Sequence, residues 1–284
     1  MPGTLYLVPT PIGNLEDITR RALRVLSEVD LVACEDTRHT RKLLSHYAIE
    51  TKTISYHEHN EHERAGELCA MLAEGKNIAL VSDAGTPLVN DPGFRLVQRA
   101  IAEKSQVIAL PGPSALITAL IGSGLPTDEF FFGGFLPARS GARRTRLERL
   151  RTIPATLIFY EAPHRIAASL KDAREIMGER NAAVARELTK LHEEVVRGTL
   201  SELAALFSSA ERARGEMVLL IDRVEISNQP DNHQSISSVS ALVAKFEDEG
   251  LDHRSALKKT AKELGIPRAE AYRRLVAERR PGDC

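Results

Sequence analysis

The first 122 residues alternate between short β-branched segments and longer amphipathic segments. Strands are expected at Leu5–Pro9, Leu31–Glu35, Thr51–Tyr56, Asn77–Asp83 and Gln106–Leu110. Helices, in which apolar residues recur every three or four positions, are expected at Ile18–Val29, Thr37–Tyr47, Glu61–Glu74 and Pro92–Glu103. Continuous apolar runs such as Ile78–Val81 are typical of strands buried on both faces. The pattern therefore predicts an α/β domain over residues 1–122, with a mostly parallel sheet.

A second α/β domain is expected over residues 123–226, because the turn-rich segment Gly122–Pro126 interrupts the first pattern. Its predicted strands are Phe130–Gly133, Ala155–Tyr160, Ala182–Arg186, Glu193–Arg197 and Met217–Val224. Its predicted helices are Arg143–Arg151, Pro163–Met177 and Leu200–Phe207.

The remaining residues predict a linker and a helical extension. Residues 227–238 are polar and rich in turn-forming residues, as in a linker. Residues 239–284 are expected to be helical, with Asp252 capping a helix that runs to Leu264 and Pro267 in the first turn of the next. The spacing of the small residues Ala261, Gly265 and Ala271 resembles that of a helix-turn-helix motif, although small helical hairpins often show this spacing by chance.

Composition and charge narrow the class of protein. Hydrophobic residues make up 43% and charged residues 27%, as in a globular protein, and no apolar run reaches the ~20 residues of a membrane helix. The N-terminus has no basic region before its apolar stretch, which argues against a signal peptide and favours a cytoplasmic location without membrane contact. The three cysteines, Cys34, Cys69 and Cys284, are too dispersed for a disulfide framework.

Net charge is −1, which argues against nonspecific coating of nucleic acid, yet basic residues are concentrated in two places. Six arginines and one acid lie between Arg139 and Arg151, and nine basic residues and three acids lie between Arg254 and Arg280. Any contact with a polyanion should therefore be confined to these two basic segments.

Three expected strands end in loops of small residues: Val8–Asn14, Val81–Pro87 and Leu110–Ala115. Glycine and alanine let backbone amides approach a ligand, and proline fixes the shape of a loop. One such loop alone indicates a tight connection, but three at the carboxyl ends of parallel strands predict a ligand site. None contains a Walker or dinucleotide-binding motif, which argues against ATP hydrolysis and nicotinamide chemistry.

Seven motifs, taken in order, carry a family resemblance: Val8–Leu15, Glu35–Thr40, Ser82–Gly93, Gly134–Pro137, Tyr160–Arg165, Arg186–Lys190 and Gly215–Val218. Together they resemble the tetrapyrrole-methylase-like superfamily and, within it, the ribosomal RNA small subunit methyltransferase I family. The similarity extends from about residue 4 to the C-terminal helices.

The resemblance implies a homodimer of two-domain chains that bind S-adenosylmethionine in the cleft between the domains. It also implies 2′-O-methylation of a decoding-centre cytidine in 16S rRNA, within the small ribosomal subunit. The cofactor contacts that it implies are Pro11, Asp83, Ala84, Gly85, Thr86, Leu88, Ser114, Ala115, Tyr160, Glu161, Leu188, Gly215, Glu216 and Met217. Tetrapyrrole-modifying relatives tend to carry Gly-Asp-Pro where this chain has Gly85-Thr86-Pro87, which argues against a porphyrin-type substrate.

Catalytic and RNA-binding candidates come from charged residues near these motifs. A 2′-hydroxyl is weakly acidic, so a base or a nearby cation would help it to lose its proton. Glu187 and Lys190 are the candidates for this role. For both residues, the alternative is a structural ion pair. The RNA-binding candidates are Arg38, Arg139, Arg143, Arg144 and Arg146, for which a solvated helix face is the alternative.

The histidines of the segment His57–His62 could form a zinc trio through His57, His59 and His62, but polar loops are common at such positions and we expect no metal. Two other functions remain open at this point. One keeps the fold and cofactor but methylates a small corrin-type tetrapyrrole. The other is a ligand-sensing protein that binds DNA through its C-terminal helices.

Overall fold

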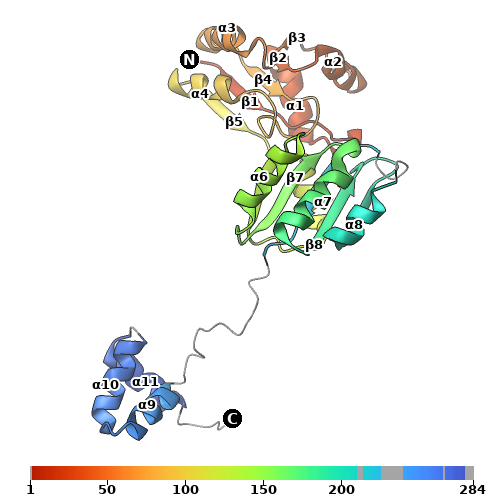
Figure 1. Ribbon diagram of the computed structural model, residues 1–284. Helices are drawn as coiled ribbons and strands as arrows, with labels where there is room; N and C mark the ends of the chain where they lie inside the picture. The colour runs from red at the N-terminus through yellow and green to blue at the C-terminus, as the bar shows by residue number, and fades with distance from the viewer. Residues whose placement is uncertain (1, 210–213, 225–238, 265, 279–284) are drawn as a thin grey trace. The chain divides into compact units, whose positions relative to one another are not determined.

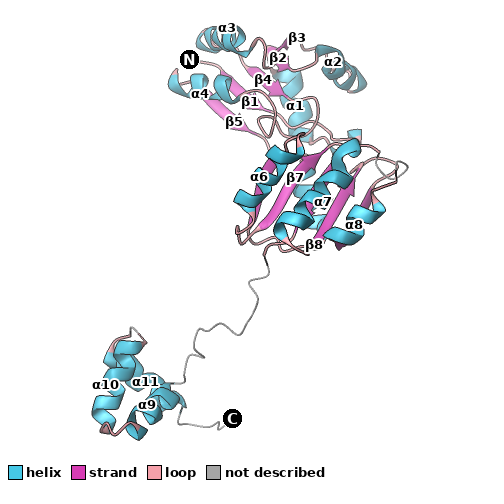
Figure 2. Cartoon of the chain, in the orientation of Figure 1, coloured by secondary structure: helices cyan, strands magenta, loops and turns pink. Residues whose placement is uncertain are grey.

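The computed structural model describes residues 2–209, 214–224, 239–264 and 266–278. The chain divides into two compact units, residues 1–224 and 225–284. The expected linker 227–238, Gly265 and Cys284 lie outside the described residues. Figures 1 and 2 show two α/β layers in the first unit and helices alone in the described part of the second.

The first sheet is entirely parallel, with strand order β3-β2-β4-β1-β5. Its strands are β1 (Thr4–Leu7), β2 (Leu31–Cys34), β3 (Thr53–Ser55), β4 (Ile78–Val81) and β5 (Gln106–Ala109). The connecting helices are α1 (Arg20–Glu28), α2 (Thr37–His46), α3 (Glu61–Ala73) and α4 (Phe94–Ala102). Every residue of β2 and β4 is buried, as their apolar runs predicted. The order brings the carboxyl ends of β4, β1 and β5 side by side.

The second sheet is mixed, with strand order β6-β7-β10-β8-β9. Strand β6 (Phe130–Phe135) is parallel to β7 (Thr156–Glu161), whereas β10 (Met217–Ile221), β8 (Asn181–Arg186) and β9 (Glu194–Thr199) pair in antiparallel fashion. The helices α6 (Ser140–Leu150), α7 (Ile166–Met177) and α8 (Leu200–Leu206) contribute to one core cluster with this sheet, and Figure 1 shows them on one of its faces. The α/β fold expected from the sequence is thus confirmed.

A helix that the hydrophobic pattern did not predict, α5 (Ala115–Ser123), contributes to a second core cluster with this sheet. Its residues Leu116 and Leu120 pack with Ile158 of β7 and Leu220 of β10. Since α5 packs against the second sheet, the chain passes from one sheet to the other between β5 and α5. The crossing therefore precedes the boundary expected at residue 122.

The second unit is a small helical bundle of α9 (Val239–Asp248), α10 (His253–Glu263) and α11 (Arg268–Glu278) around one apolar cluster. The carboxylate of Asp252 accepts a hydrogen bond from the Arg254 amide at 3.2 Å, which confirms the predicted cap of α10. Among the residues that the structure describes, no helix is long and apolar enough to cross a membrane.

Candidate active site

The three small-residue loops meet at the carboxyl edge of the first sheet. Thr10 and Gly85 exchange two backbone hydrogen bonds of 2.9 Å, which join the loops after β1 and β4. The Thr86 hydroxyl donates to the Pro113 carbonyl at 3.0 Å and so joins the loop after β5. These bonds satisfy polar groups that would otherwise be stranded at the sheet edge. The three loops that the sequence singled out as a candidate ligand site therefore lie together.

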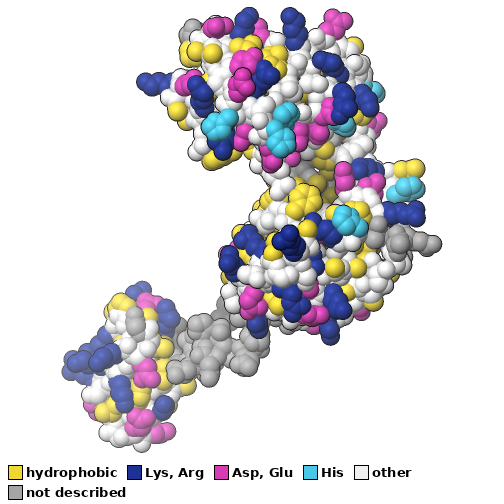
Figure 3. Space-filling model, turned by 45° about the horizontal axis from the view of Figure 1, so that its top comes forward, with side chains coloured by type: hydrophobic (Ala, Val, Ile, Leu, Met, Phe, Trp, Pro, Cys, Tyr) yellow, Lys and Arg dark blue, Asp and Glu magenta, His cyan; other side chains and the backbone are white. Residues whose placement is uncertain are grey.

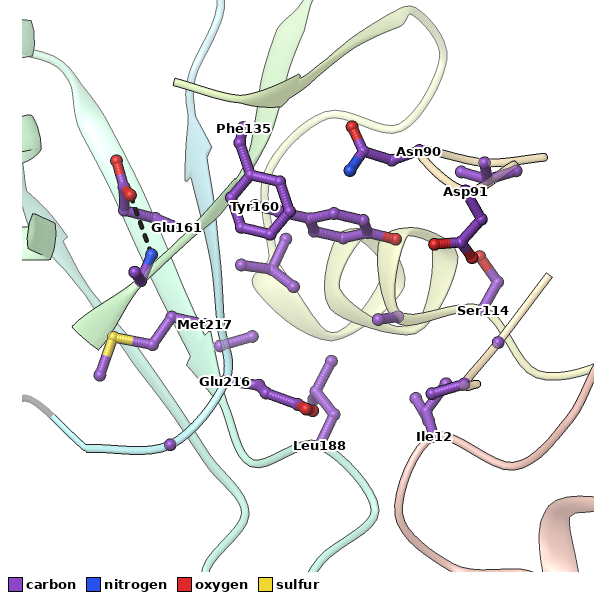
Figure 4. A pocket seen from close by; sticks show the side chains of 18 of the residues that line it. Ile12, Asn90, Asp91, Ser114, Phe135, Tyr160, Glu161, Leu188, Glu216 and Met217 are labelled. Atoms are coloured by element: carbon purple, nitrogen blue, oxygen red, sulfur yellow. Dashed lines mark hydrogen bonds between the residues drawn. The ribbon is translucent and has the colours of Figure 1, made fainter. Parts of the chain in front are cut away.

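A cavity of about 440 Å³ lies where these loops face the second sheet (Figure 4), a volume within the range of small-molecule sites. Most of the predicted cofactor contacts line it: Asp83, Ala84, Gly85, Thr86, Ser114, Ala115, Tyr160, Glu161, Leu188, Gly215, Glu216 and Met217. Pro11 and Leu88 do not line it. Pro11 precedes the lining residue Ile12, and the Leu88 side chain packs against the core of the first sheet.

Sequence reasoning did not single out several other lining residues: Ile12, Val89, Asn90, Asp91, Phe135, Ala162, Pro163, Ala185 and Val218. All except Ala185 lie inside the seven motifs. The motifs therefore indicated the segments that form the cavity, but not which of their residues face it.

One wall of the cavity is aromatic and apolar. The Tyr160 ring packs edge-on against Phe132 and Phe135, with centroids 4.9 and 5.6 Å apart, and Figure 4 shows its hydroxyl pointing toward the Asp91 side. Ile12 and Leu188 add aliphatic surface. This wall can hold an aromatic or thioether group away from water.

Two carboxylates from the loop after β4 line the opposite side of the cavity. Asp83 accepts a hydrogen bond from the Asp36 amide at 3.1 Å, which ties this loop to the start of α2. Burial, helped by the negative charge of Glu35, raises the pKa of Asp91 to about 6. Asp91 thus changes charge close to neutral pH, and a cation bound nearby would favour its ionised form.

A third carboxylate, Glu161, is almost completely buried and fully engaged. It accepts hydrogen bonds from the Ala162 amide at 2.8 Å and the Ser169 hydroxyl at 2.5 Å, and it pairs with Arg165 at 3.0 Å. With its oxygens so occupied, Glu161 fixes the shape of the cavity wall at the end of β7.

The catalytic candidates Glu187 and Lys190 lie beside the cavity and contact a residue that lines it. The Lys190 ammonium contacts the carboxylates of Glu187 and Glu216, each at 3.0 Å, and the Glu216 amide donates to Glu187 at 3.0 Å. That amide, together with Lys190, lowers the pKa of Glu187. Partial burial alone would lower the pKa of Lys190, but its two carboxylate partners raise it. Lys190 is therefore held as a cation.

The predicted RNA contacts occupy different environments. Arg143 is only 4% exposed, and its guanidinium pairs with Asp172 at 2.6 Å, so the prediction that it contacts RNA is corrected: the side chain is inside the protein. Arg144 pairs with Glu175 and Asp172. The Arg146 guanidinium lies 5.8 Å from the centroid of the Phe131 ring, and Arg139 is exposed at the start of α6.

Arg38 is highly exposed, with 87% of its side chain accessible, and it contacts Asp36 through two nitrogens at 2.7 and 3.1 Å. The hydrogen bond from Arg38 holds the pKa of Asp36 well below its usual range.

The three histidines that could have formed a zinc trio do not converge. The rings of His57 and His59 meet edge to face with centroids 5.9 Å apart, while His62 hydrogen-bonds Arg95 at 2.8 Å. Within the described ranges, no three His, Cys, Asp or Glu side chains are placed to hold a metal ion.

Known proteins that are similar to this chain identify its family. The profile of the Tetrapyrrole (Corrin/Porphyrin) Methylases matches residues 4–204. Ribosomal RNA small subunit methyltransferase I of Escherichia coli O157:H7 is 53% identical over 246 residues, which cover 86% of each chain. The protein of the same name from Micromonospora olivasterospora is 47% identical over 283 residues, 98% of this chain and 88% of that one. This chain belongs to the ribosomal RNA small subunit methyltransferase I family.

Solved structures of other methylases share the fold of this ribosomal RNA small subunit methyltransferase I family member. Uroporphyrin-III C-methyltransferase of Thermus thermophilus, complexed with S-adenosylhomocysteine, is 19% identical with a TM-score of 0.55, over 78% of this chain and 97% of that one. A diphthine synthase is 17% identical with a TM-score of 0.60, over 78% and 90%. The predictions of the family, of a methyltransferase and of S-adenosylmethionine as its cofactor are confirmed.

The cavity residues fit S-adenosylmethionine chemically. The apolar wall at Tyr160 and Leu188 suits the adenine and thioether parts, and the carboxylates of Asp83 and Asp91 suit hydroxyl groups and positive charge. When bound, this cofactor supplies a methyl group on a positively charged sulfur. The loops around Gly85 and Gly215 would hold it through backbone amides and carbonyls.

Proposed function

We propose that this protein methylates the 2′-hydroxyl of a decoding-centre cytidine in 16S rRNA, within the small ribosomal subunit. The observation that carries the proposal is the 47–53% identity, over most of the chain, to proteins named ribosomal RNA small subunit methyltransferase I. The tetrapyrrole methylases reach only 17–21% and support the fold alone. A corrin-type substrate is therefore disfavoured. A cytoplasmic location follows from the proposed substrate.

The experiment that tests this function uses purified protein, labelled S-adenosylmethionine, and small ribosomal subunits or free 16S rRNA in parallel. Label should enter one specific cytidine, and mass spectrometry of nucleosides should place the methyl group on the ribose. Label on a base, or label that enters precorrins and neither RNA substrate, would reject the proposal.

Glu187 and Lys190 are proposed to act by positioning. In methyl transfer, the O–CH₃ bond forms as the S–CH₃ bond breaks, and the hydroxyl proton must leave, so alignment of the attacking oxygen supplies much of the acceleration. The Lys190 ammonium ties Glu216, which lines the cavity, to Glu187 and so holds this side of the cavity in place. A base role suits neither residue, because Lys190 is protonated and the pKa of Glu187 is lowered.

The raised pKa of Asp91 predicts that cofactor affinity depends on pH. Below about pH 6 Asp91 is protonated, and binding a sulfonium beside it requires release of that proton. Affinity for S-adenosylmethionine should therefore fall as pH decreases from 7 to 5, by up to about tenfold per pH unit for one linked proton. Calorimetric titrations across this range measure it.

Two controls test this pH dependence. Asp91→Asn should flatten the pH profile, and S-adenosylhomocysteine, whose sulfur is uncharged, should show a weaker dependence with the wild-type protein. Equal slopes for both ligands would show that Asp91 does not respond to the sulfonium.

Arg139, the exposed N-cap residue of α6, and the partly exposed Arg146 of that helix are proposed to contact rRNA phosphates. Replacing Arg139 and Arg146 with glutamine should raise the KM for rRNA and reduce the salt dependence of binding by about one unit per arginine that contacts phosphate. Affinity for the cofactor should not change. Arg24→Gln with Arg99→Gln removes two arginines that already pair with acids four residues further along the chain, and it serves as the control. Equal KM values for the two double variants would reject these contacts.

A homodimer is also proposed, and exposed apolar residues of α5 support it. Ile117 and Ile121 lie one turn apart, and Ile121 is 71% exposed, which is unusual for a large aliphatic side chain. Sedimentation equilibrium should give twice the chain mass, and Ile121→Lys should shift the protein toward monomer. A monomeric wild-type protein at micromolar concentration would exclude this interface.

A further inference from the structure

The helix α10 of the second unit has one apolar face and one cationic face. Ala256, Leu257 and Ala261 belong to the apolar cluster that α10 shares with α9 and α11. On the opposite side Arg254, Lys258 and Lys262 follow one another at four-residue spacing, and all three are exposed. We call these three residues the α10 basic face. Figure 3 shows Lys and Arg side chains gathered along one side of this unit.

No residue of the α10 basic face forms an ion pair within the part of the chain that the structure describes. Three other cations of the same unit do: Lys259 pairs with Glu249 at 3.1 Å, and Arg273 and Arg274 pair with Glu270 at 2.9 and 3.0 Å. Like charges one helical turn apart destabilise a helix by about 0.2–0.5 kcal/mol per pair. Arg254 also lies in the first turn, where the helix dipole disfavours positive charge. Folding of the helix therefore does not account for this row.

The chemistry of the face points to a polyanion. Its surroundings on α10 are polar, with Ser255 between the cations and Glu263 as the one exposed acid of that helix. Protein interfaces are depleted in lysine and need an apolar centre, which this face does not offer. A row of unpaired cations instead neutralises successive phosphates and releases their counterions.

We propose that the α10 basic face binds the phosphate backbone of ribosomal RNA, so that the second unit is an RNA-docking element for the enzyme. The inference rests on the proposed function for the identity of the RNA. Binding through phosphates makes the contact insensitive to sequence, and it would add affinity without touching the methyl-transfer site.

The test uses the full chain and a 16S rRNA transcript without cofactor, with binding followed by fluorescence anisotropy from 50 to 300 mM KCl. The variant Arg254→Gln/Lys258→Gln/Lys262→Gln should lose about two to three units of the slope of log K against log salt, since each phosphate contact contributes roughly 0.7–0.9. The matched control, Lys259→Gln/Arg273→Gln/Arg274→Gln, removes the same charge from the same unit but only from paired residues. It should lose less than one unit.

Methylation kinetics complete the test. The basic-face variant should raise the KM for rRNA while kcat and cofactor affinity stay at wild-type values. A wild-type salt slope, or an equal loss in the control, would overturn the proposal. If no form of the protein methylates rRNA but the two variants differ in slope, the proposed function fails and the α10 basic face stands as an RNA-binding surface.

Discussion

Replacing Asp172 with alanine is expected to lower the free energy of unfolding by about 3–5 kcal/mol, because it leaves the buried Arg143 guanidinium without its counter-charge. Arg143 is bound to Asp172 through two nitrogens, at 2.6 and 2.7 Å, and the Ser140 hydroxyl donates to the same carboxylate at 3.0 Å. The pair joins α6 to α7, the two helices that lie side by side on one face of the second sheet. Urea unfolding followed by circular dichroism measures the loss.

The matched control is Arg143→Met combined with Asp172→Leu, which removes both charges and keeps the volume apolar. A buried pair replaced in this way often loses little or no stability, so the double variant should recover most of the loss. A loss below about 1 kcal/mol in Asp172→Ala would show that Arg143 reaches water after all, and would restore it as a candidate for RNA contact.

The second large effect is expected from Gly215→Ala, which should weaken binding of S-adenosylmethionine by about tenfold to a hundredfold. Gly215 has a φ of +79°, and a Cβ atom there would collide with the side chain of Glu187. Glu187 cannot move aside without losing its bonds to Lys190 and the Glu216 amide. Strain of this kind costs about 1–3 kcal/mol, and 1.4 kcal/mol is tenfold in affinity.

Gly141→Ala provides the control for this change. Gly141 lies in helix α6, and a Cβ atom there would meet nothing within 4 Å. It should leave cofactor affinity unchanged and slightly stabilise the helix. Calorimetry on both variants decides the matter. Equal affinities would mean that the loop at Gly215 can relax without disturbing the cavity.

Much of the fold could be predicted because most strands and helices have a single apolar pattern. The strands β2 and β4 are uninterrupted apolar runs, and α1 shows clear three- and four-residue spacing. Helix α5 was missed because its sequence ALITALIGS is apolar on almost every side and lacks that spacing. Periodicity cannot separate a helix that is apolar on almost every side from an apolar connecting segment.

For the candidate site, too, some residues could be predicted from the sequence and others could not. The residues Asp83–Thr86 and Gly215–Met217, predicted as cofactor contacts, all line the cavity, and their contacts with the cofactor stay a prediction. Arg143 could not be placed, because burial of an arginine depends on a partner 29 positions away in the sequence, Asp172 on α7. The raised pKa of Asp91 likewise depends on burial and on the charge of Glu35, both of which arise only in the folded protein.

The hydrogen bond between the Asp36 amide and Asp83 has a consequence for any coupling between the cavity and the surface at Arg38. Asp83 lines the cavity, and Asp36 both caps α2 and holds the exposed Arg38. A ligand that draws the Asp83 carboxylate toward itself would compete with that bond, which joins the cavity to the residue that holds Arg38. Linkage then requires reciprocity: any factor by which cofactor tightens binding of RNA near Arg38 must equal the factor by which RNA tightens binding of cofactor.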